Sequence, residues 1–421
     1  MIPGRGHQPE VMHSFDASVP AVVLSPARYG GLGVIRSLGR AGVPVYGVLE
    51  ARSVPAASSR YLAGRRYIMR PDYNDVAAVT QGLTRLGERI GRQAVLLATD
   101  DATAIFLAEH GDELRRWFLF PSPPADLPRR VADKRTLSEV CRESGMASPQ
   151  VFPAESLEDA MEFAASVGFP VVVKVTPPWL AGIVPSTSLI HDADGLADIY
   201  RRCAEKGISP ILQEYISGGD GADWFFHGYC DMNSVCRPAF TGVKERSLPV
   251  GSGLTTYGRS TANDKLRDIV SAFLAQLKYR GVMDLDIRLN ASDGQYHLLD
   301  FNPRFGAQSR IFRDTAGIDV ALAAYLDLTG QPVPAGIQLD DRYFMAEGYD
   351  PPSALTYWRR GELSLRTWLA QVCGTDEFSW FATDDLLPFG QVCLRMAWKA
   401  ARRPIARTSR NARDADPGKD D

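Results

Sequence analysis

The chain has 421 residues, of which 45% are hydrophobic and 23% are charged, and 47 Lys and Arg stand against 50 Asp and Glu. This composition is typical of a soluble globular protein with two or three domains. The near balance of charge excludes the positive coat that nucleic-acid-binding proteins carry. Six cysteines without a CxxC pair exclude a zinc cluster and a disulfide framework, so we expect a reducing cytoplasm.

The two ends of the chain lack the apolar periodicity of packed structure. Residues 1–19 are polar and contain no apolar core of a secretory signal, and residues 401–421 are first Arg-rich and then Asp-rich. We expect both segments to be disordered. No run of about 18 uncharged apolar residues occurs, so we expect no transmembrane helix.

Residues 20–130 are expected to form an open α/β domain with a parallel sheet. Strand-like residues 21–24 lead through a glycine turn into a helical pattern and then into a second strand at 43–48, which together make a βαβ unit. A third strand at 94–98 runs into Thr99, Asp100 and Asp101, which can cap a helix at 102–109. The proline cluster at 121–128 marks the end of this domain.

Residues 131–330 are expected to be α+β with an antiparallel sheet. The apolar patterns predict helices at 134–144, 157–167 and 263–279, and strands at 170–175, 211–216, 224–230, 239–244, 282–289 and 296–302. A proline-rich hinge after Gly330 opens a C-terminal extension, residues 331–400. Residues 386–403 mix apolar and basic side chains, which favours a helix docked on its own domain over one that lies on an anionic membrane or a partner subunit.

The glycine turn is a weak signal for a dinucleotide site. Gly30, Gly31 and Gly33 follow a strand and open a helix, but their spacing is not GxGxxG and only Glu50 approximates the acid that a ribose would need. We expect these glycines to permit a tight turn or to line a substrate edge, and we prefer this interpretation to a nicotinamide-dependent oxidoreductase. Arg28 lies in the same loop.

The residues with the clearest chemistry lie between positions 281 and 306. Two predicted strands, joined by Asp293 and Gly294, place Asp286 beside Asp300 and Asn302. Two carboxylates and an amide oxygen suit Mg²⁺ that is shared with a substrate phosphate. Arg304 follows at the same period of two and can hold a phosphoryl oxygen. The alternative is a strand end with ordinary turn residues.

Other polar residues point to a bound nucleotide. Lys174 lies in an otherwise apolar strand, and a buried ammonium group is costly unless an anion meets it. Lys134 opens a helix, where a solvated surface lysine is an equal alternative. The apolar strand at residues 213–216 is interrupted by an acid and runs into a glycine-rich turn, which suits a hinge around adenine and ribose.

With these residues in place, the chain resembles the ATP-grasp superfamily, in its carboxylate-amine ligase-like branch. The resemblance covers residues 20–330, and its most specific motif is DFNPRF, Asp300 to Phe305. It implies a pre-ATP-grasp α/β domain and a two-subdomain ATP-grasp fold, whose lid subdomain covers about residues 150–215.

The resemblance also implies a role for each candidate residue. Phosphates would be bound by Lys134 and Lys174, adenine by Gln213, Glu214, Tyr215 and Ile216, and ribose by Asp223 in preference to Asp220. Two Mg²⁺ ions, or Mn²⁺ in their place, would be held by Asp286, Asp300 and Asn302. The catalytic residues would be Lys174, Arg304 at the acyl phosphate and Arg246 beside the loop at 251–256. Arg288 would support the metal site or face an acidic substrate group.

The implied reaction joins a carboxylate to an amine through an acyl phosphate and releases ADP and phosphate. Amino acids or peptides are the expected substrates, and a homodimer is the expected assembly. The family usually has a glycine-rich loop after Lys174, whereas here only Gly182 occurs, close to Trp179. An ATP-binding regulatory protein is therefore the alternative. We expect His227 to be a core residue and not a base for the amine.

Overall fold

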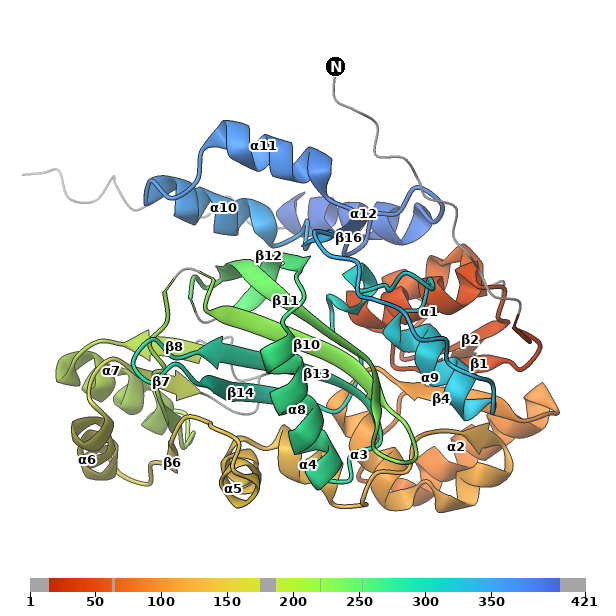
Figure 1. Ribbon diagram of the computed structural model, residues 1–421, viewed down its shortest axis with the longest axis horizontal. Helices are drawn as coiled ribbons and strands as arrows, with labels where there is room; N and C mark the ends of the chain where they lie inside the picture. The colour runs from red at the N-terminus through yellow and green to blue at the C-terminus, as the bar shows by residue number, and fades with distance from the viewer. Residues whose placement is uncertain (1–14, 63–64, 175–186, 220, 252, 402–421) are drawn as a thin grey trace, which may run out of the picture.

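The computed structural model describes residues 15–62, 65–174, 187–219, 221–251 and 253–401. Within these residues the strands form three sheets, and the helices cover their faces (Figure 1). The parallel and antiparallel sheets follow one another along the chain as expected, so the predicted fold class is confirmed. Among the described residues, none of the helices is long and apolar enough to cross a membrane.

The first sheet is parallel, and five described strands form it in the order β3-β2-β1-β4-β5. Its strands are β1 (Ala21–Leu24), β2 (Val45–Leu49), β3 (Arg66–Ile68), β4 (Ala94–Ala98) and β5 (Phe118–Leu119). The helices of this region are α1 (Tyr29–Arg40), α2 (Val76–Ile90) and α3 (Asp101–His110). Asp100 caps α3 by accepting a hydrogen bond from the backbone of Thr103 at 2.7 Å, as the sequence indicated.

Two short helices, α4 (Leu127–Ala132) and α5 (Lys134–Ser144), lead to a small antiparallel sheet of order β6-β9-β7-β8. Its elements are β6 (Val151–Pro153), α6 (Leu157–Val167), β7 (Val171–Lys174), β8 (Thr187–Ile190), α7 (Ala193–Ala204) and β9 (Ile211–Glu214). They share a small core that includes Ala160, Val171 and Leu212. These elements lie within residues 150–215, and their role as a lid stays a prediction.

The largest sheet contains seven described strands in the order β14-β13-β10-β11-β12-β15-β16. Its strands are β10 (Asp223–Cys230), β11 (Cys236–Leu248), β12 (Leu254–Ser260), β13 (Gly281–Leu289), β14 (Tyr296–Asn302), β15 (Tyr343–Met345) and β16 (Glu377–Phe378). Helix α8 (Asp264–Gln276) packs on one side through Val270 and Phe273. Helix α9 (Val320–Leu328) joins the core that Leu32 and Ile35 of α1 also share, which fastens this sheet to the first one.

The C-terminal extension completes the large sheet and then forms a helical layer above it (Figure 1). Strand β15 pairs with β12 through Tyr343 and Arg259. The layer consists of α10 (Asp350–Arg359), α11 (Leu365–Gly374) and α12 (Leu387–Ala401). A buried ion pair between Arg36 and Asp385, at 3.0 Å, ties it to α1. The segment after residue 330 is thus built into the body of the protein.

Residues 15–19 differ from the expected disordered lead. The ring of Phe15 packs edge-on against Tyr325 of α9 at 6.2 Å, and the Tyr325 hydroxyl donates to the carbonyl of Val19 at 2.9 Å. This partner lies more than 300 positions away in the sequence, so no local pattern indicates it. The remaining residues of the expected lead and tail, 1–14 and 402–421, lie outside the described residues.

Candidate active site

A cavity of about 1180 Å³ lies where the three sheets meet. The first domain contributes Asp101 at the start of α3, the small sheet contributes Lys174 and Gln213, and the large sheet contributes Asp286 and Asp300. Because each part of the fold supplies polar side chains to one space, this cavity is the candidate site.

The hairpin β13–β14 places the predicted carboxylates side by side. Asp286 lies opposite Asp300, and Asp284 lies opposite Asn302. The turn closes at Gly294, which has a φ of 67° that favours glycine. The Asn302 amide nitrogen donates to the carbonyl of Asp284 at 3.1 Å, which leaves the amide oxygen as an acceptor. The structure therefore brings together the predicted donors Asp286, Asp300 and Asn302.

Lys134 reaches this hairpin from the start of α5. Asp133 caps the helix by accepting from the backbone of Arg135 and Thr136 at 3.0 and 3.2 Å, which fixes Lys134 in the first turn. The Lys134 ammonium group bonds to the Asp300 carboxylate. Burial raises the pKa of Asp300, but the charges of Lys134 and Lys174 outweigh burial and hold this pKa at about 2. Asp300 is therefore an anion at neutral pH.

Lys174 ends β7 and lines the same cavity. Burial, together with the neighbouring charge of Lys134, lowers the pKa of Lys174 to about 8. A bound anion would stabilise the ammonium form and reverse this shift. The electrostatics of Lys174 thus suit a site that receives a phosphate.

Lys244 is a cavity residue that the sequence analysis did not select. Its ammonium group lies 2.8 Å from the Asp286 carboxylate, and this partner keeps the pKa of Lys244 raised although burial alone would lower it. Asp286 itself has a raised pKa because it is buried. Lys244 and Asp286 form a second cation and carboxylate pair beside that of Lys134 and Asp300.

The structure does not bring Arg246 to the cavity. The pairing of β11 with β12 shifts register between Lys244 and Arg246, so the two side chains do not follow one alternation. Arg246 is 3% exposed, and its guanidinium group donates twice to Asp350 at 3.0 Å and once to Gln371 at 2.5 Å. Lys244 therefore lines the cavity, whereas Arg246 binds the helical layer.

Arg304 lines the cavity and is held by two carboxylates. Its guanidinium group lies 2.7 Å from Asp284 and 3.5 Å from Asp101. Burial lowers the pKa of Arg304, but these two partners outweigh it and the pKa is raised. Asp101 belongs to α3 of the first domain, so Arg304 is oriented from both sides of the cavity. Strand alternation places Asp284 on the same face as Asp286, so the sequence could have indicated this partner of Arg304. No sequence pattern indicates that Asp101 contacts Arg304.

His227 lies next to this cluster but inside the core. It is 1% exposed, its Nε2 atom lies 3.4 Å from Asp284, and burial lowers its pKa, so the imidazole is neutral at pH 7. A Cβ atom at Gly306 would lie 2.0 Å from the His227 ring, so only glycine fits there. The position of His227 agrees with the expected core residue.

The predicted nucleotide-binding segment forms one wall of the cavity. Gln213, Glu214, Tyr215, Ile216 and Asp223 all line it. Arg288 forms a bidentate salt bridge with Asp223, with nitrogen–oxygen distances of 2.6 and 2.8 Å. Its guanidinium group also lies 5.4 Å from the centre of the Tyr215 ring. Arg288 therefore fixes the carboxylate that is expected at a ribose.

The glycines of α1 permit close packing at the opposite wall. A Cβ atom at Gly31 would lie 2.6 Å from Pro26, and one at Gly30 would lie 3.2 Å from the carbonyl oxygen of Gly306. Both glycines line the cavity, as does the exposed Arg28. They open the helix directly, since α1 already begins at Tyr29.

Aromatic side chains from the C-terminal extension line the end of the cavity next to Tyr29. Tyr349 and Trp380 line it, and the Trp380 ring lies edge-on to Tyr29 at 5.8 Å. Glu347 holds the Trp380 segment by accepting from the backbone nitrogen of Trp380 at 2.7 Å. Sequence analysis missed these residues because the loop that carries Trp380 reaches the site only through long-range packing.

The donor set agrees with a metal that is shared with phosphate. The described residues contain no group of three or more His, Cys, Asp or Glu that could hold a metal ion. Asp286, Asp300 and Asn302 offer only oxygen donors, which suit Mg²⁺, and the two carboxylates pair with lysines. A cation here would complete its coordination with substrate oxygens. The altered lid segment around Trp179 and Gly182, and Asp220, lie outside the described residues.

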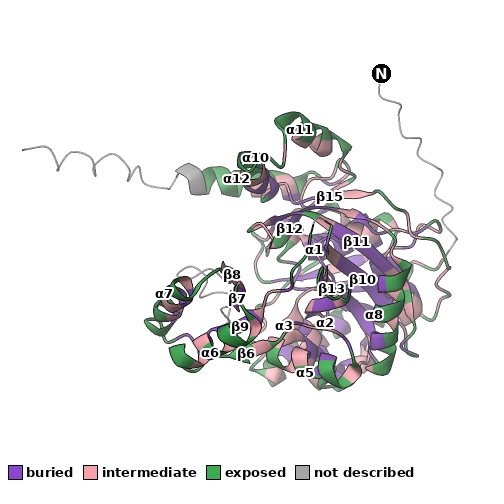
Figure 2. Ribbon diagram, turned by 60° about the vertical axis from the view of Figure 1, so that its left-hand side comes forward, coloured by how far each residue is buried: buried purple, intermediate pink, exposed green. Residues whose placement is uncertain are grey.

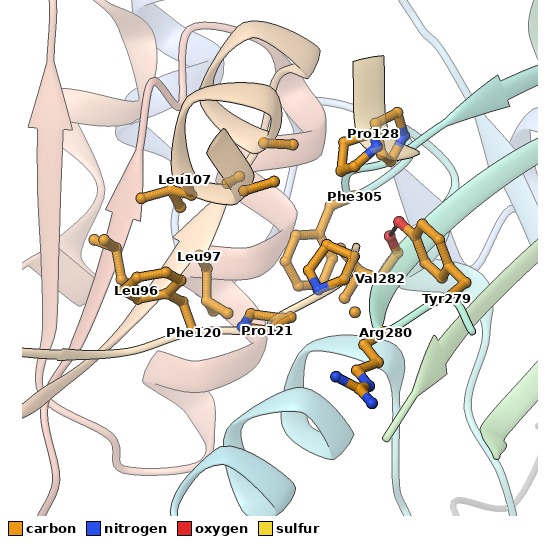
Figure 3. A pocket seen from close by; sticks show the side chains of 16 residues that line it. Leu96, Leu97, Leu107, Phe120, Pro121, Pro128, Tyr279, Arg280, Val282 and Phe305 are labelled. Atoms are coloured by element: carbon orange, nitrogen blue, oxygen red, sulfur yellow. Dashed lines mark hydrogen bonds between the residues drawn. The ribbon is translucent and has the colours of Figure 1, made fainter. Parts of the chain in front are cut away.

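A second cavity, of about 50 Å³, lies between the first domain and the large sheet (Figure 3). Leu97, Leu107, Phe120, Tyr279 and Phe305 line it, and its walls are largely apolar. This volume is far below the several hundred Å³ that ligand pockets usually have, roughly 300–1,000 Å³. It is a packing void, and the larger cavity remains the candidate site.

Comparisons with known proteins give similarity across much of the chain. No family model matches it. D-aspartate ligase from Enterococcus faecium is 26% identical over 247 residues, which cover 55% of this chain and 57% of that enzyme. The chain therefore matches little more than half the length of this curated relative.

Solved structures show the fold. N5-carboxyaminoimidazole synthetase from Staphylococcus aureus complexed with ADP has a TM-score of 0.59 and 13% identity, over 79% of this chain and 83% of that chain. The biotin carboxylase domain of the 2-oxoglutarate carboxylase from Hydrogenobacter thermophilus has a TM-score of 0.57 and 14% identity, over 77% and 74%. These proteins share the ATP-grasp fold.

Proposed function

We propose that this chain, which has the ATP-grasp fold, is an ATP-dependent ligase that joins a carboxylate to an amine. The reaction forms an acyl phosphate and releases ADP and phosphate. The observation that carries this proposal is the convergence of four cations on two carboxylates in one cavity. These cations are Lys134, Lys174, Lys244 and Arg304.

ATP binds along the wall formed by the small sheet and β10. The segment Gln213–Ile216 receives adenine, and Asp223, fixed by Arg288, receives the ribose hydroxyls. Lys134 and Lys174 meet the phosphates. The low pKa of Lys174 supports this role, because a phosphate is the type of anion that would stabilise its ammonium form. The ADP in the Staphylococcus aureus neighbour supports a nucleotide in this fold.

Asp286, Asp300 and Asn302 hold Mg²⁺, with two ions as the proposed number and Mn²⁺ as a substitute. When bound, the metal neutralises phosphate charge that would repel an incoming carboxylate. Lys134 and Lys244 balance the same two carboxylates in the structure. The side chains are thus arranged so that charge stays close to neutral with and without nucleotide.

In the first step, a carboxylate oxygen of the substrate attacks the γ-phosphorus of ATP. The new oxygen–phosphorus bond forms as the bond to the β–γ bridging oxygen breaks, and ADP leaves with that electron pair. Arg304 holds the equatorial oxygens of the transferred group. Because Asp284 and Asp101 fix its guanidinium group, little reorganisation is needed as charge builds up.

In the second step, the amine nitrogen attacks the acyl carbon, the carbon–oxygen bond to phosphate breaks, and the nitrogen loses a proton. Arg28, Tyr29 and Trp380 line the end of the cavity next to the first domain, and we assign the carboxylate and amine substrates to this end. An amino acid is the proposed amine, supported by the similarity to a D-aspartate ligase.

We place this activity in the cytoplasm, because ATP and reduced thiols coexist there and the cysteines of the described chain are free. A homodimer is the proposed assembly, supported by the dimer of the biotin carboxylase domain that the chain resembles in fold.

Release of ADP and phosphate from ATP and Mg²⁺ tests the proposal, with pooled carboxylates and pooled amines that include both forms of aspartate. Release should require both pools and should stop in the double variant Asp300→Ala, Asn302→Ala. Asp268→Asn is the matched control, since this side chain is 77% exposed on α8. Tight ATP binding without release from any mixture would instead support the regulatory protein.

A further inference from the structure

Exposed apolar side chains are concentrated in the helical layer α10–α12 and the segments next to its helices. Figure 2 shows that much of this layer is exposed. More than half of the large hydrophobic residues exposed in the described chain lie between positions 349 and 398. They are Tyr349, Leu355, Trp358, Leu365, Leu369, Leu386, Leu387, Leu394, Met396 and Trp398. Such a concentration on a folded protein marks a surface that contacts another apolar phase.

Helix α10 has one buried side and one apolar outer side. Asp350, Ser353 and Ala354 are buried. Leu355 and Trp358 are 44% and 56% exposed, and their spacing of three places them on the same side of the helix. The exposed apolar residues of α10 are therefore a stripe and not isolated positions.

Helix α11 is held to the body by polar contacts and contains no buried residue. Trp368 and Gln371 anchor it to Asp350 and Arg246. Leu365 and Leu369, 62% and 50% exposed, lie one turn apart. A helix held in this way presents its leucines to a partner outside the chain.

Helix α12 packs at its start and is exposed at its end. Pro388 is buried, whereas every residue from 393 to 398 is exposed, with Leu394 at 72% and Trp398 at 56%. The helix projects from the layer in Figure 2. The expectation of a helix docked on its own domain thus holds for the first part of α12 only.

The charges of this layer are sorted between its two sides. Most of its acids are turned to the body: Asp384 and Asp385 bind Arg40 and Arg36, and Asp376 accepts from the backbone of Tyr343. The arginines are exposed, namely Arg359, Arg360, Arg366 and Arg395. The outer side is therefore cationic as well as apolar.

We propose that α10, α11 and α12 form a docking surface for an anionic lipid bilayer. Leucine and tryptophan side chains insert at the boundary between headgroups and acyl chains, while arginines meet lipid phosphates. A second copy of the chain fits less well, since a symmetric contact through this face would oppose cationic surfaces. Tyr349, which directly precedes α10, also lines the cavity, so docking would bring this end of the cavity close to a membrane.

Flotation of the full-length protein with vesicles tests this surface. Vesicles of phosphatidylglycerol and phosphatidylcholine in equal parts should bind about tenfold more protein than pure phosphatidylcholine, and salt should weaken this binding. The variant Trp358→Ser, Leu365→Ser, Leu369→Ser should lose about tenfold of the bound fraction, because its apolar contacts are gone. Its melting temperature should not change, since all three side chains are exposed.

Two controls separate the surface from general stickiness. The variant Met232→Ser, Val235→Ser, Ile337→Ser removes three exposed apolar side chains elsewhere and should bind vesicles normally. Replacing Arg359, Arg360 and Arg366 by Gln should weaken binding, whereas replacing them by Lys should preserve it. Equal flotation of both serine variants would overturn the proposal. Absence of binding to anionic vesicles would also overturn it. If the protein instead self-associates, and only the variant Trp358→Ser, Leu365→Ser, Leu369→Ser loses this self-association, the surface binds a second copy of the chain and the proposal is wrong.

Discussion

Two arginines of the large sheet, Arg304 and Arg246, are both bound by aspartates but differ in access. The side chain of Arg304 is 22% exposed and faces the cavity between Asp284 and Asp101. The side chains of Arg246 and Asp350 are 3% and 0% exposed. A similar ion pair thus faces the cavity at one place and is enclosed by the fold at the other.

The two arginines differ in whether protein groups surround the whole guanidinium group or leave part of it open to the cavity. Arg246 donates to Asp350 and Gln371 and lies 4.4 Å from the ring of Tyr257, so protein groups surround it. Arg304 contacts Asp284 and Asp101 along one part of its guanidinium group and keeps a part open to the cavity. Access to the cavity, and not charge alone, separates a catalytic candidate from a structural ion pair.

The largest expected effect is on stability at the closed pair. Asp350→Ala leaves Arg246 buried without its carboxylate, and loss of one partner of a buried pair costs about 3–5 kcal/mol. The urea midpoint of unfolding measures this change. Asp198→Ala breaks an exposed pair with Arg201 and should cost less than about 1 kcal/mol. Similar midpoints for the two variants would show that the Arg246 pair does not stabilise the fold.

The next effect is on catalysis at the open cluster. Arg304→Met removes a group that stabilises transferred charge, so turnover should fall about 10²–10³-fold. Arg246→Met should retain the turnover number of the protein that remains folded, because this side chain does not reach the cavity. Steady-state ADP release, normalised to the folded fraction, measures both. A larger loss in Arg246→Met than in Arg304→Met would reverse the assignment.

A smaller effect concerns pH and Lys174. The pKa of Lys174 is lowered to about 8, so its ammonium form is present below this value and is lost as pH rises through it. ATP affinity should therefore weaken about fivefold over the pH unit above this pKa, as the ammonium fraction falls. Titration calorimetry between pH 7.5 and 9 measures the trend. Lys174→Arg should show a nearly flat profile, and an equally steep profile in this variant would exclude Lys174 as the titrating group.

The smallest effect concerns the helix that presents Lys134. Asp133→Ala removes the side-chain cap of α5, which should cost about 1 kcal/mol of stability. Affinity for ATP should weaken slightly, since Lys134 lies in the first turn. Unfolding by urea and ATP titration measure the two changes. Unchanged stability would show that the cap does not hold this turn in place.

Sequence alone predicted the parts of the site that depend on local rules. The Asp286 and Asp300 pair follows from strand alternation and a glycine turn, and the structure has the two residues opposite each other. The nucleotide wall from Gln213 to Ile216 is one strand and its continuation, so its place followed from the order of elements. The function of these residues stays a prediction.

The remainder depends on contacts between distant segments. A register shift in β11 separates Lys244 from Arg246, and a bulge of this kind leaves no clear sequence signal. Asp101 contacts Arg304 from helix α3 of the first domain, and Trp380 reaches the cavity from the C-terminal extension. Each of these positions is set by long-range packing, which periodicity does not encode.

Trapping of the acyl phosphate tests the central claim most directly. The protein is incubated with Mg²⁺, ATP, pooled carboxylates and hydroxylamine, but without any amine substrate, and hydroxamate is measured against ADP. We expect equal amounts of hydroxamate and ADP in the wild type, and both products to form about 10²–10³-fold more slowly in Arg304→Met. Release of ADP without hydroxamate, or no binding of ATP at all, would contradict the assignment of this cavity to an ATP-dependent carboxylate-amine ligase.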